Sequence, residues 1–350
     1  MNNTRILIYD TTLRDGAQTS GISFSLQDKI RIAGELDRIQ VDYIEGGWPG
    51  SNPKDNIFFS EIRKAELQHA KIAAFGSTKR QHYTFDNDDL LQQLVQSGAS
   101  TITIVAKTWD FQVTRALNIS LQQNFDLIYG TVAYLKDKGF EVFLDAEHFY
   151  DGFAANPDYS LKTLEKAREA GADMVVLCDT NGGTLPHDIE RITRLVVEQM
   201  QMPTGVHFHN DAGVAVANSI AAVRAGVISV QGTMNGYGER CGNCDLTAFI
   251  PNLVFKMGYK CAASGALAHL TEVSRYISEI ANLAHNERAP YVGNDAFTHK
   301  GGIHVSALKK DTKTYEHLDP ALVGNRRRVR YPSRENIEAD KIPRRPGVPV

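Results

Sequence analysis

The stretch ADMVVLCDTNGG, residues 172–183, is a short apolar run that ends in polar residues and two glycines. The run before it, EVFLDAEHF (141–149), and the run after it, TGVHFHND (204–211), follow the same plan. Short runs of this kind, rich in β-branched residues and bounded by turn residues, predict strands. Five further runs bring the number of predicted strands to eight: 5–10, 41–47, 71–77, 100–106 and 228–235.

Longer amphipathic segments separate these strands and predict helices. Several of them end in the glycine that is typical just past a helix C-terminus. Strict alternation of strand and helix predicts a parallel sheet. Eight strands within roughly 230 residues match an α/β fold of the closed (β/α)8 TIM barrel type, because an open doubly wound sheet usually has fewer strands. The predicted helices lie at 25–39, 88–98, 120–139, 160–171 and 214–226.

The pattern changes near residue 265. Residues 267–283 predict one long amphipathic helix, and the glycine-containing segment HKGGIH (299–304) follows it. The last stretch holds four prolines and many charges, a composition that predicts disorder. The predicted parts are a barrel domain (5–265), a small, mainly helical C-terminal subdomain (266–328) and an atypical, disordered tail (329–350).

The composition argues against several classes of binding partner and against a secreted protein. The chain has 38 basic and 41 acidic residues, so no strong field favours nucleic acid or an anionic membrane, and small soluble substrates fit better. Four cysteines in 350 residues are too few for a secreted disulfide scaffold. The N-terminus has no pattern of a signal peptide, and no apolar run reaches membrane-spanning length. We therefore expect a cytoplasmic protein that binds neither nucleic acid nor a membrane.

The polar residues that could hold an ion follow the predicted strands. In a parallel barrel the active site lies at the C-terminal ends of the strands. His207 and His209 are two positions apart on one strand, so both imidazoles point to the same face, and Asp15 follows the first strand. Two histidines and one carboxylate are typical of a divalent-metal site, with zinc, manganese, magnesium and iron all open at this point. For Asp15 the alternative is a helix N-cap.

Several motifs together resemble a known family of barrel enzymes that condense acetyl-CoA with 2-oxo acids. The family comprises the isopropylmalate, homocitrate and citramalate synthases, with hydroxymethylglutaryl-CoA lyase as a more distant relative. The segment EGGWPGSNPKD (45–55) most resembles the citramalate synthase branch. The resemblance covers about residues 5–325 and rests on DTTLRDGAQ (10–18), CDTNGG (178–183), HFHND (207–211), GERCGNCD (238–245) and HKGGIH (299–304).

The resemblance implies a set of metal ligands and a neighbouring cation. Asp15, His207, His209 and Asn243 would hold a divalent metal ion (Mg2+, Mn2+ or Zn2+) that chelates the 2-oxo acid. Arg14 would stabilise the developing oxyanion or enolate, and its alternative is a plain salt-bridge partner. Cys241 and Cys244 form a CxxC, but the sequence has no second CxxC or CxxH to complete a zinc site. We interpret them as small residues beside Asn243.

The remaining roles also follow from the resemblance. Glu147 would remove a proton from acetyl-CoA, the co-substrate, although Asp145 and Asp151 are acidic neighbours. His304 would assist Glu147 from a partner subunit, which implies a homodimer; otherwise it is a solvated surface residue. Three residues are predicted to bind substrate. Gln18 would hold Arg14 in place. Glu45 and Thr180 would contact the substrate carboxylate or the metal's water shell.

The expected reaction is the condensation of acetyl-CoA with pyruvate, followed by thioester hydrolysis, to give (R)-citramalate and CoA for isoleucine biosynthesis. The runner-up is 2-isopropylmalate synthase, which uses 2-oxoisovalerate in leucine biosynthesis. These substrates differ by a methyl against an isopropyl group, which a pocket separates by only about 1–3 kcal/mol per methylene. A third interpretation is a truncated, inactive barrel that acts as a dimerisation scaffold, because the tail departs from the longer relatives. For the same reason we expect no feedback control.

Overall fold

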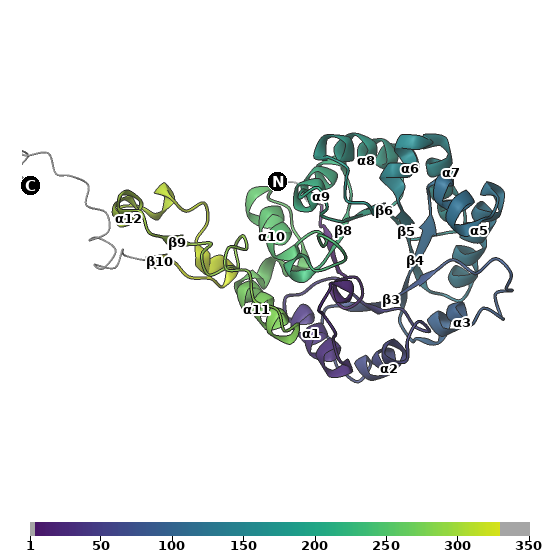
Figure 1. Ribbon diagram of the computed structural model, residues 1–350, viewed down its shortest axis with the longest axis horizontal. Helices are drawn as coiled ribbons and strands as arrows, with labels where there is room; N and C mark the ends of the chain where they lie inside the picture. The colour runs from purple at the N-terminus through teal and green to yellow at the C-terminus, as the bar shows by residue number, and fades with distance from the viewer. Residues whose placement is uncertain (1–3, 330–350) are drawn as a thin grey trace, which may run out of the picture.

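The computed structural model describes residues 4–329 and contains a closed barrel of eight parallel strands surrounded by helices (Figure 1). Strand β8 pairs with β1, with Leu7 opposite Ser229 and Asp10 opposite Gly232, and this pairing closes the barrel. The predicted (β/α)8 architecture is therefore confirmed. The strands are β1 (Leu7–Asp10), β2 (Tyr43–Gly47), β3 (Lys71–Ser77), β4 (Thr101–Lys107), β5 (Glu141–Glu147), β6 (Met174–Asp179), β7 (Thr204–Phe208) and β8 (Ser229–Gly232).

The helices around the barrel begin where the sequence supplies capping residues. Ser25 and Ser120 each accept a hydrogen bond from the backbone three residues on and form complete capping boxes. Such reciprocal caps satisfy two backbone donors that the helix itself leaves unpaired. The outer helices are α1 (Leu26–Arg38), α2 (Pro53–Ile62), α3 (Asp89–Gln96), α4 (Asp110–Gln112), α5 (Leu121–Asp137), α6 (Phe149–Ala155), α7 (Pro157–Glu169), α8 (Pro186–Met200) and α9 (Ala215–Ala225).

Strand alternation separates two apolar layers. On β7, Phe208 points outward and packs on Tyr150, with ring centroids 5.7 Å apart, whereas His207 lines the interior cavity. Below the cavity, a cluster that includes Tyr9, Tyr43 and Phe143 fills the barrel. The interior is therefore a packed core that ends in a polar layer at the C-terminal ends of the strands.

The chain beyond the barrel forms an arm that extends to one side (Figure 1). The helix predicted over 267–283 is shorter than expected, because residues 267–269 form a 3-10 turn and Asn282 has a left-handed φ of 53°. The predicted boundary at residue 265 stays a prediction, and all of the predicted tail except Val329 lies outside the described residues. Two helices, α10 (Leu246–Pro251) and α11 (Leu270–Ile280), lie beside the barrel, and the arm carries β9 (Thr298–His299), α12 (Gly302–Leu308) and β10 (Arg328–Val329).

Within residues 4–329, no helix is at once long enough and apolar enough to cross a lipid bilayer.

Candidate metal centre and surrounding cavity

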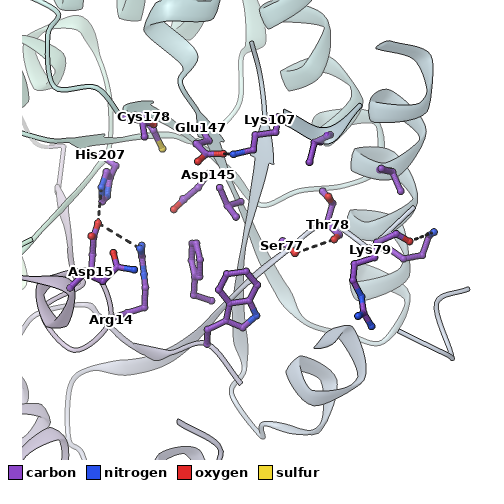
Figure 2. A pocket seen from close by; sticks show the side chains of 18 of the residues that line it. Arg14, Asp15, Ser77, Thr78, Lys79, Lys107, Asp145, Glu147, Cys178 and His207 are labelled. Carbon is purple, nitrogen blue, oxygen red and sulfur yellow. Dashed lines mark hydrogen bonds and ion pairs between the residues drawn. The ribbon is translucent and has the colours of Figure 1, made fainter. Parts of the chain in front are cut away.

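A cavity of about 650 Å³ opens at the C-terminal ends of the barrel strands, as expected for this fold. Figure 2 shows its lining side chains converging from opposite sides of the barrel. Most of the residues predicted for the site line it, and they arrive on separate strands and loops. These are Arg14, Asp15, Gln18, Glu147, Thr180, His207 and His209.

Asp15, His207 and His209 form a compact, buried group on one side of this cavity. The Oδ2 atom of Asp15 lies 3.2 Å from Nε2 of His207 and 3.8 Å from Nε2 of His209. The two Nε2 atoms are 3.4 Å apart. Three ligand atoms from a carboxylate and two imidazoles therefore face one point, an arrangement that can hold a divalent metal ion.

Local structure brings Asp15 to this point. The backbone N–H groups of Arg14 and Gly16 both donate to the carbonyl of Thr11, which bends the chain inward directly after β1. Asp15 does precede the short helical turn Gly16–Gln18, but its side chain makes no capping hydrogen bond. The N-cap alternative for Asp15 is therefore not the role that its carboxylate fills.

Electrostatics favour ionised Asp15 and neutral His209. Burial raises the pKa of Asp15, but the charge of Arg14 and the hydrogen bond from His207 outweigh it and hold that pKa well below its usual value. Burial and the charge of His207 lower the pKa of His209 to about 4. Burial also opposes the charge on His207, but the hydrogen bond and charge of Asp15 raise its pKa overall. A deprotonated carboxylate and a neutral imidazole are the forms that bind metal ions.

Asn243 lies beside this group. Its backbone bridges to His209, and its Nδ2 donates to the carbonyl of Tyr237 at 3.1 Å. Its Oδ1 is buried without a hydrogen-bond partner among residues 4–329. A buried, unpaired amide oxygen costs free energy unless a ligand satisfies it. The carboxylate, two imidazoles and one amide oxygen thus fit a divalent ion as a donor set.

Arg14 is held by Glu45, on the side of the guanidinium that faces away from the cavity. The buried Glu45 carboxylate accepts hydrogen bonds from Nε of Arg14 at 2.5 Å, from the Tyr9 hydroxyl at 2.8 Å and from the Thr11 hydroxyl at 2.6 Å. The guanidinium also lies 4.0 Å from the ring centroid of Phe75. Glu45 itself is fully buried and is not among the residues that line the cavity. In this structure Glu45 contacts Arg14, and its predicted contact with the substrate carboxylate or the metal's water shell stays a prediction.

Glu147 ends β5 and forms an ion pair with Lys107, which lies opposite it at the end of β4 (Figure 2). Lys107 was not among the predicted site residues, although it directly follows the predicted strand 100–106. Asp145 and Gln231 were also missed, and they form a buried link to His207. A search for polar residues at every strand end would have found Lys107.

Gln18 and Thr180 also line the cavity. Gln18 is exposed, and within residues 4–329 its side chain makes no hydrogen bond to Arg14. The hydroxyl of Thr180 accepts a hydrogen bond from the backbone N–H of His148 at 2.8 Å. The role of Gln18 in holding Arg14 stays a prediction, and Thr180 fixes the backbone that follows Glu147.

His304 lies on α12, in the arm and outside the cavity (Figure 1). Its ring stacks on Tyr315, with centroids 4.0 Å apart. The structure does not bring His304 to Glu147 within one chain.

The CxxC cysteines do not pair with each other. Cys241 is exposed, whereas Cys244 is buried and its Sγ accepts a hydrogen bond from the Ser219 hydroxyl at 3.1 Å. Both thiols are free, and their assignment as small residues beside Asn243 stays an interpretation.

The family model described as HMGL-like matches residues 5–277, which include the barrel and the metal-binding group. The chain belongs to the HMGL-like family. A second model, described as homocitrate synthase post-HMGL domain-like, matches residues 291–336.

Two curated proteins and one crystal structure are similar to this HMGL-like chain. It is 55% identical over 324 residues to a protein named (R)-citramalate synthase from Geobacter sulfurreducens and 52% identical over 334 residues to one of the same name from Synechocystis. Each match covers 93% of this chain, which spans only 61% of each relative's length. The crystal structure of hydroxymethylglutaryl-CoA lyase from Pseudomonas aeruginosa shares the fold, with a TM-score of 0.68 and 19% identity over 82% of this chain and 96% of that one.

Proposed function

We propose that this chain catalyses the metal-dependent condensation of acetyl-CoA with pyruvate and the hydrolysis of the thioester, giving (R)-citramalate and CoA. The observation that carries the proposal is the buried Asp15–His207–His209 group beside Arg14 and Glu147 in one cavity. This arrangement supplies separate sites for a metal ion, a developing negative charge and a proton.

Asp15, His207, His209 and Asn243 would hold the ion. A bound divalent ion supplies Lewis-acid polarisation of the ketone of a 2-oxo acid, which makes the ketone carbon electrophilic. Asp15 brings a negative charge and Asn243 a neutral oxygen. The chain's own contribution is to fix these four donors before substrate arrives, so little reorganisation is needed during reaction.

Arg14 is the group we assign to the oxyanion that develops on the ketone oxygen. Its Nε is occupied by Glu45, so its two terminal NH2 groups remain to face the cavity. NH1 also lies 3.6 Å from Oδ2 of Asp15, which places the guanidinium next to the proposed metal. A fixed donor in a site that excludes water stabilises charge far better than a mobile one in solvent.

Glu147 is the general base in this proposal. It would take a proton from the methyl group of acetyl-CoA, and the resulting enolate carbon would attack the ketone carbon. Lys107 neutralises Glu147 before substrate binds, because the two side chains form an ion pair. When acetyl-CoA enters, the ammonium can turn to its thioester oxygen, which releases the carboxylate for proton transfer.

Pyruvate is favoured over 2-oxoisovalerate on similarity, since the two relatives named above carry the name (R)-citramalate synthase and are identical to this chain at 55% and 52% of the aligned residues. The cavity volume does not separate the two substrates. Isopropylmalate synthesis therefore stays the alternative reaction for the same site.

The homodimer belongs to the proposal as well. His304 lies outside the cavity of its own chain, and Ile303 beside it is 80% exposed. A second copy that covers this part of the arm would bring His304 to the partner's Glu147. A large apolar residue this exposed is consistent with a contact surface.

The proposal is tested by release of free CoA thiol from acetyl-CoA in the presence of Mg2+ or Mn2+. Pyruvate, 2-oxoisovalerate and 2-oxoglutarate are supplied separately. We expect pyruvate-dependent release that Asp15→Ala abolishes and Glu147→Gln lowers by about 10²–10⁴-fold in kcat. A preference for 2-oxoisovalerate would change the substrate and keep the mechanism. No release with any acid, while Mn2+ still binds, would favour the scaffold interpretation.

A further inference from the structure

Gln231 lies next to the proposed metal ligands but carries no role in the reaction described above. It occupies β8 opposite His207 of β7, so both side chains point into the barrel. Gln231 is 1% exposed, and its Oε1 lies 2.9 Å from Nδ1 of His207. Its Nε2 donates to Oδ1 of Asp145 on β5 at 3.0 Å, across the barrel. Three buried side chains thus form one chain of hydrogen bonds.

The direction of each hydrogen bond follows from the chemistry of the amide. When Asp145 is ionised, its carboxylate can only accept a hydrogen bond, so the NH2 group of Gln231 faces it. The amide carbonyl then faces His207 and can only accept. Nδ1 of His207 must therefore carry a proton, so Nε2, which faces Asp15 and His209, is the ring atom left to bind a metal ion.

The second histidine has no such partner. Nδ1 of His209 is buried without a hydrogen bond among residues 4–329, whereas Nδ1 of His207 is held by Gln231. A metal-bound histidine usually donates its other ring N–H to a fixed acceptor, and loss of that acceptor typically lowers metal affinity by about 10–100-fold. Among the residues that the structure describes, such a fixed acceptor is present for His207 and absent for His209.

We propose that Gln231 is a positioning residue that sets the tautomer of His207 for metal binding, and that Asp145 fixes the orientation of the Gln231 amide. This inference rests on the metal site of the proposed function. Without Asp145, the amide could turn over and present its NH2 group to His207. The imidazole would then have to place its proton on Nε2, the atom that the metal requires.

The first test is the affinity of the full chain for Mn2+ alone, measured by calorimetry. Gln231→Leu keeps the approximate volume and removes the acceptor. We expect its Kd for Mn2+ to rise by about 10–100-fold. In metal-free protein, 15N chemical shifts should show Nδ1 of His207 protonated in the wild type and partly deprotonated in the variant. Loss of packing alone would not move that signature.

A reversed pair provides the rescue. Gln231→Glu combined with Asp145→Asn exchanges the two groups, so that a carboxylate accepts from His207 and an amide donates to that carboxylate. We expect the double variant to recover Mn2+ affinity to within a few-fold of wild type. The control is Thr193→Val, which removes a buried 2.7 Å hydrogen bond to Tyr150 outside the barrel and should leave the Kd unchanged.

The outcomes separate this inference from the proposed reaction. Wild-type affinity in Gln231→Leu, or loss of affinity that the reversed pair does not restore, would overturn the role of Gln231. A wild-type chain that binds no Mn2+ would overturn the metal site and this inference together. A wild-type chain that binds Mn2+ tightly but releases no CoA thiol would overturn only the proposed function.

Discussion

At the scale of single residues, Glu45 decides whether Arg14 is held in place. Its carboxylate accepts three hydrogen bonds at full burial, so Glu45→Gln removes a charge and turns one acceptor into a donor. We expect a loss of about 1–3 kcal/mol in the free energy of unfolding. We also expect a fall of roughly 10²-fold in kcat/KM, because Arg14 is misplaced. Urea denaturation and CoA release measure the two effects.

A matched control lies at the opposite end of the barrel. Glu141 accepts hydrogen bonds from a tyrosine, Tyr43, at 3.1 Å and from a threonine, Thr101, at 2.6 Å, but it is partly exposed and far from the cavity. Glu141→Gln should leave kcat/KM unchanged. Equal losses of activity in both variants would contradict the role assigned to Glu45.

Asp145 gives a pH-dependent prediction. Burial, and then the charge of Glu45, raise the pKa of Asp145 to about 7 in the folded chain. The folded state therefore holds a proton that the unfolded state releases from about pH 4 upward. The free energy of unfolding should fall between about pH 4 and pH 7, by at most roughly 1.4 kcal/mol for each pH unit. Asp145→Asn should remove this part of the pH dependence. Urea denaturation at a series of pH values, with EDTA to keep the chain metal-free, measures the free energy of unfolding of both proteins. Identical pH profiles for variant and wild type would refute the prediction.

At the scale of elements, the turn after β6 depends on Gly182. Its φ is +64°, and an added Cβ would lie 2.5 Å from Oδ2 of Asp211 and 2.9 Å from the backbone of His209. Gly182→Ala should therefore destabilise the fold by more than about 1 kcal/mol and disturb the Asp211–Arg240 ion pair at the cavity rim.

The neighbouring glycine is the control for this turn. A Cβ at Gly183 would meet no atom within 4 Å, and its φ is not positive. Gly183→Ala should stay within about 0.5 kcal/mol of wild type. Denaturation midpoints compare the two variants, and equal stability would mean that the turn tolerates a side chain at Gly182.

At the scale of the whole molecule, the arm that carries His304 leads away from the cavity of its own chain (Figure 1). If the site is shared in a homodimer, chains with Asp15→Ala and chains with His304→Ala are each inactive but complement each other. Mixed dimers contain one site with both wild-type residues, so co-refolded chains should regain CoA release. Each variant refolded alone is the control. No recovery, although mass in solution shows mixed dimers, would exclude a shared site.

The residue pattern alone is enough to predict the barrel, the rim on which the site lies and the proximity of His207, His209 and Asp15. These features follow from local periodicity, because side chains two apart on a strand share a face and parallel strands end at one edge. Other contacts join successive strands across the helices between them, such as Lys107 with Glu147 and Gln231 with His207. Those pairs depend on strand register, which non-local packing of the closed barrel sets and no local pattern encodes. The burial of Glu45 behind Arg14 likewise depends on how the strands of the closed barrel pack around it.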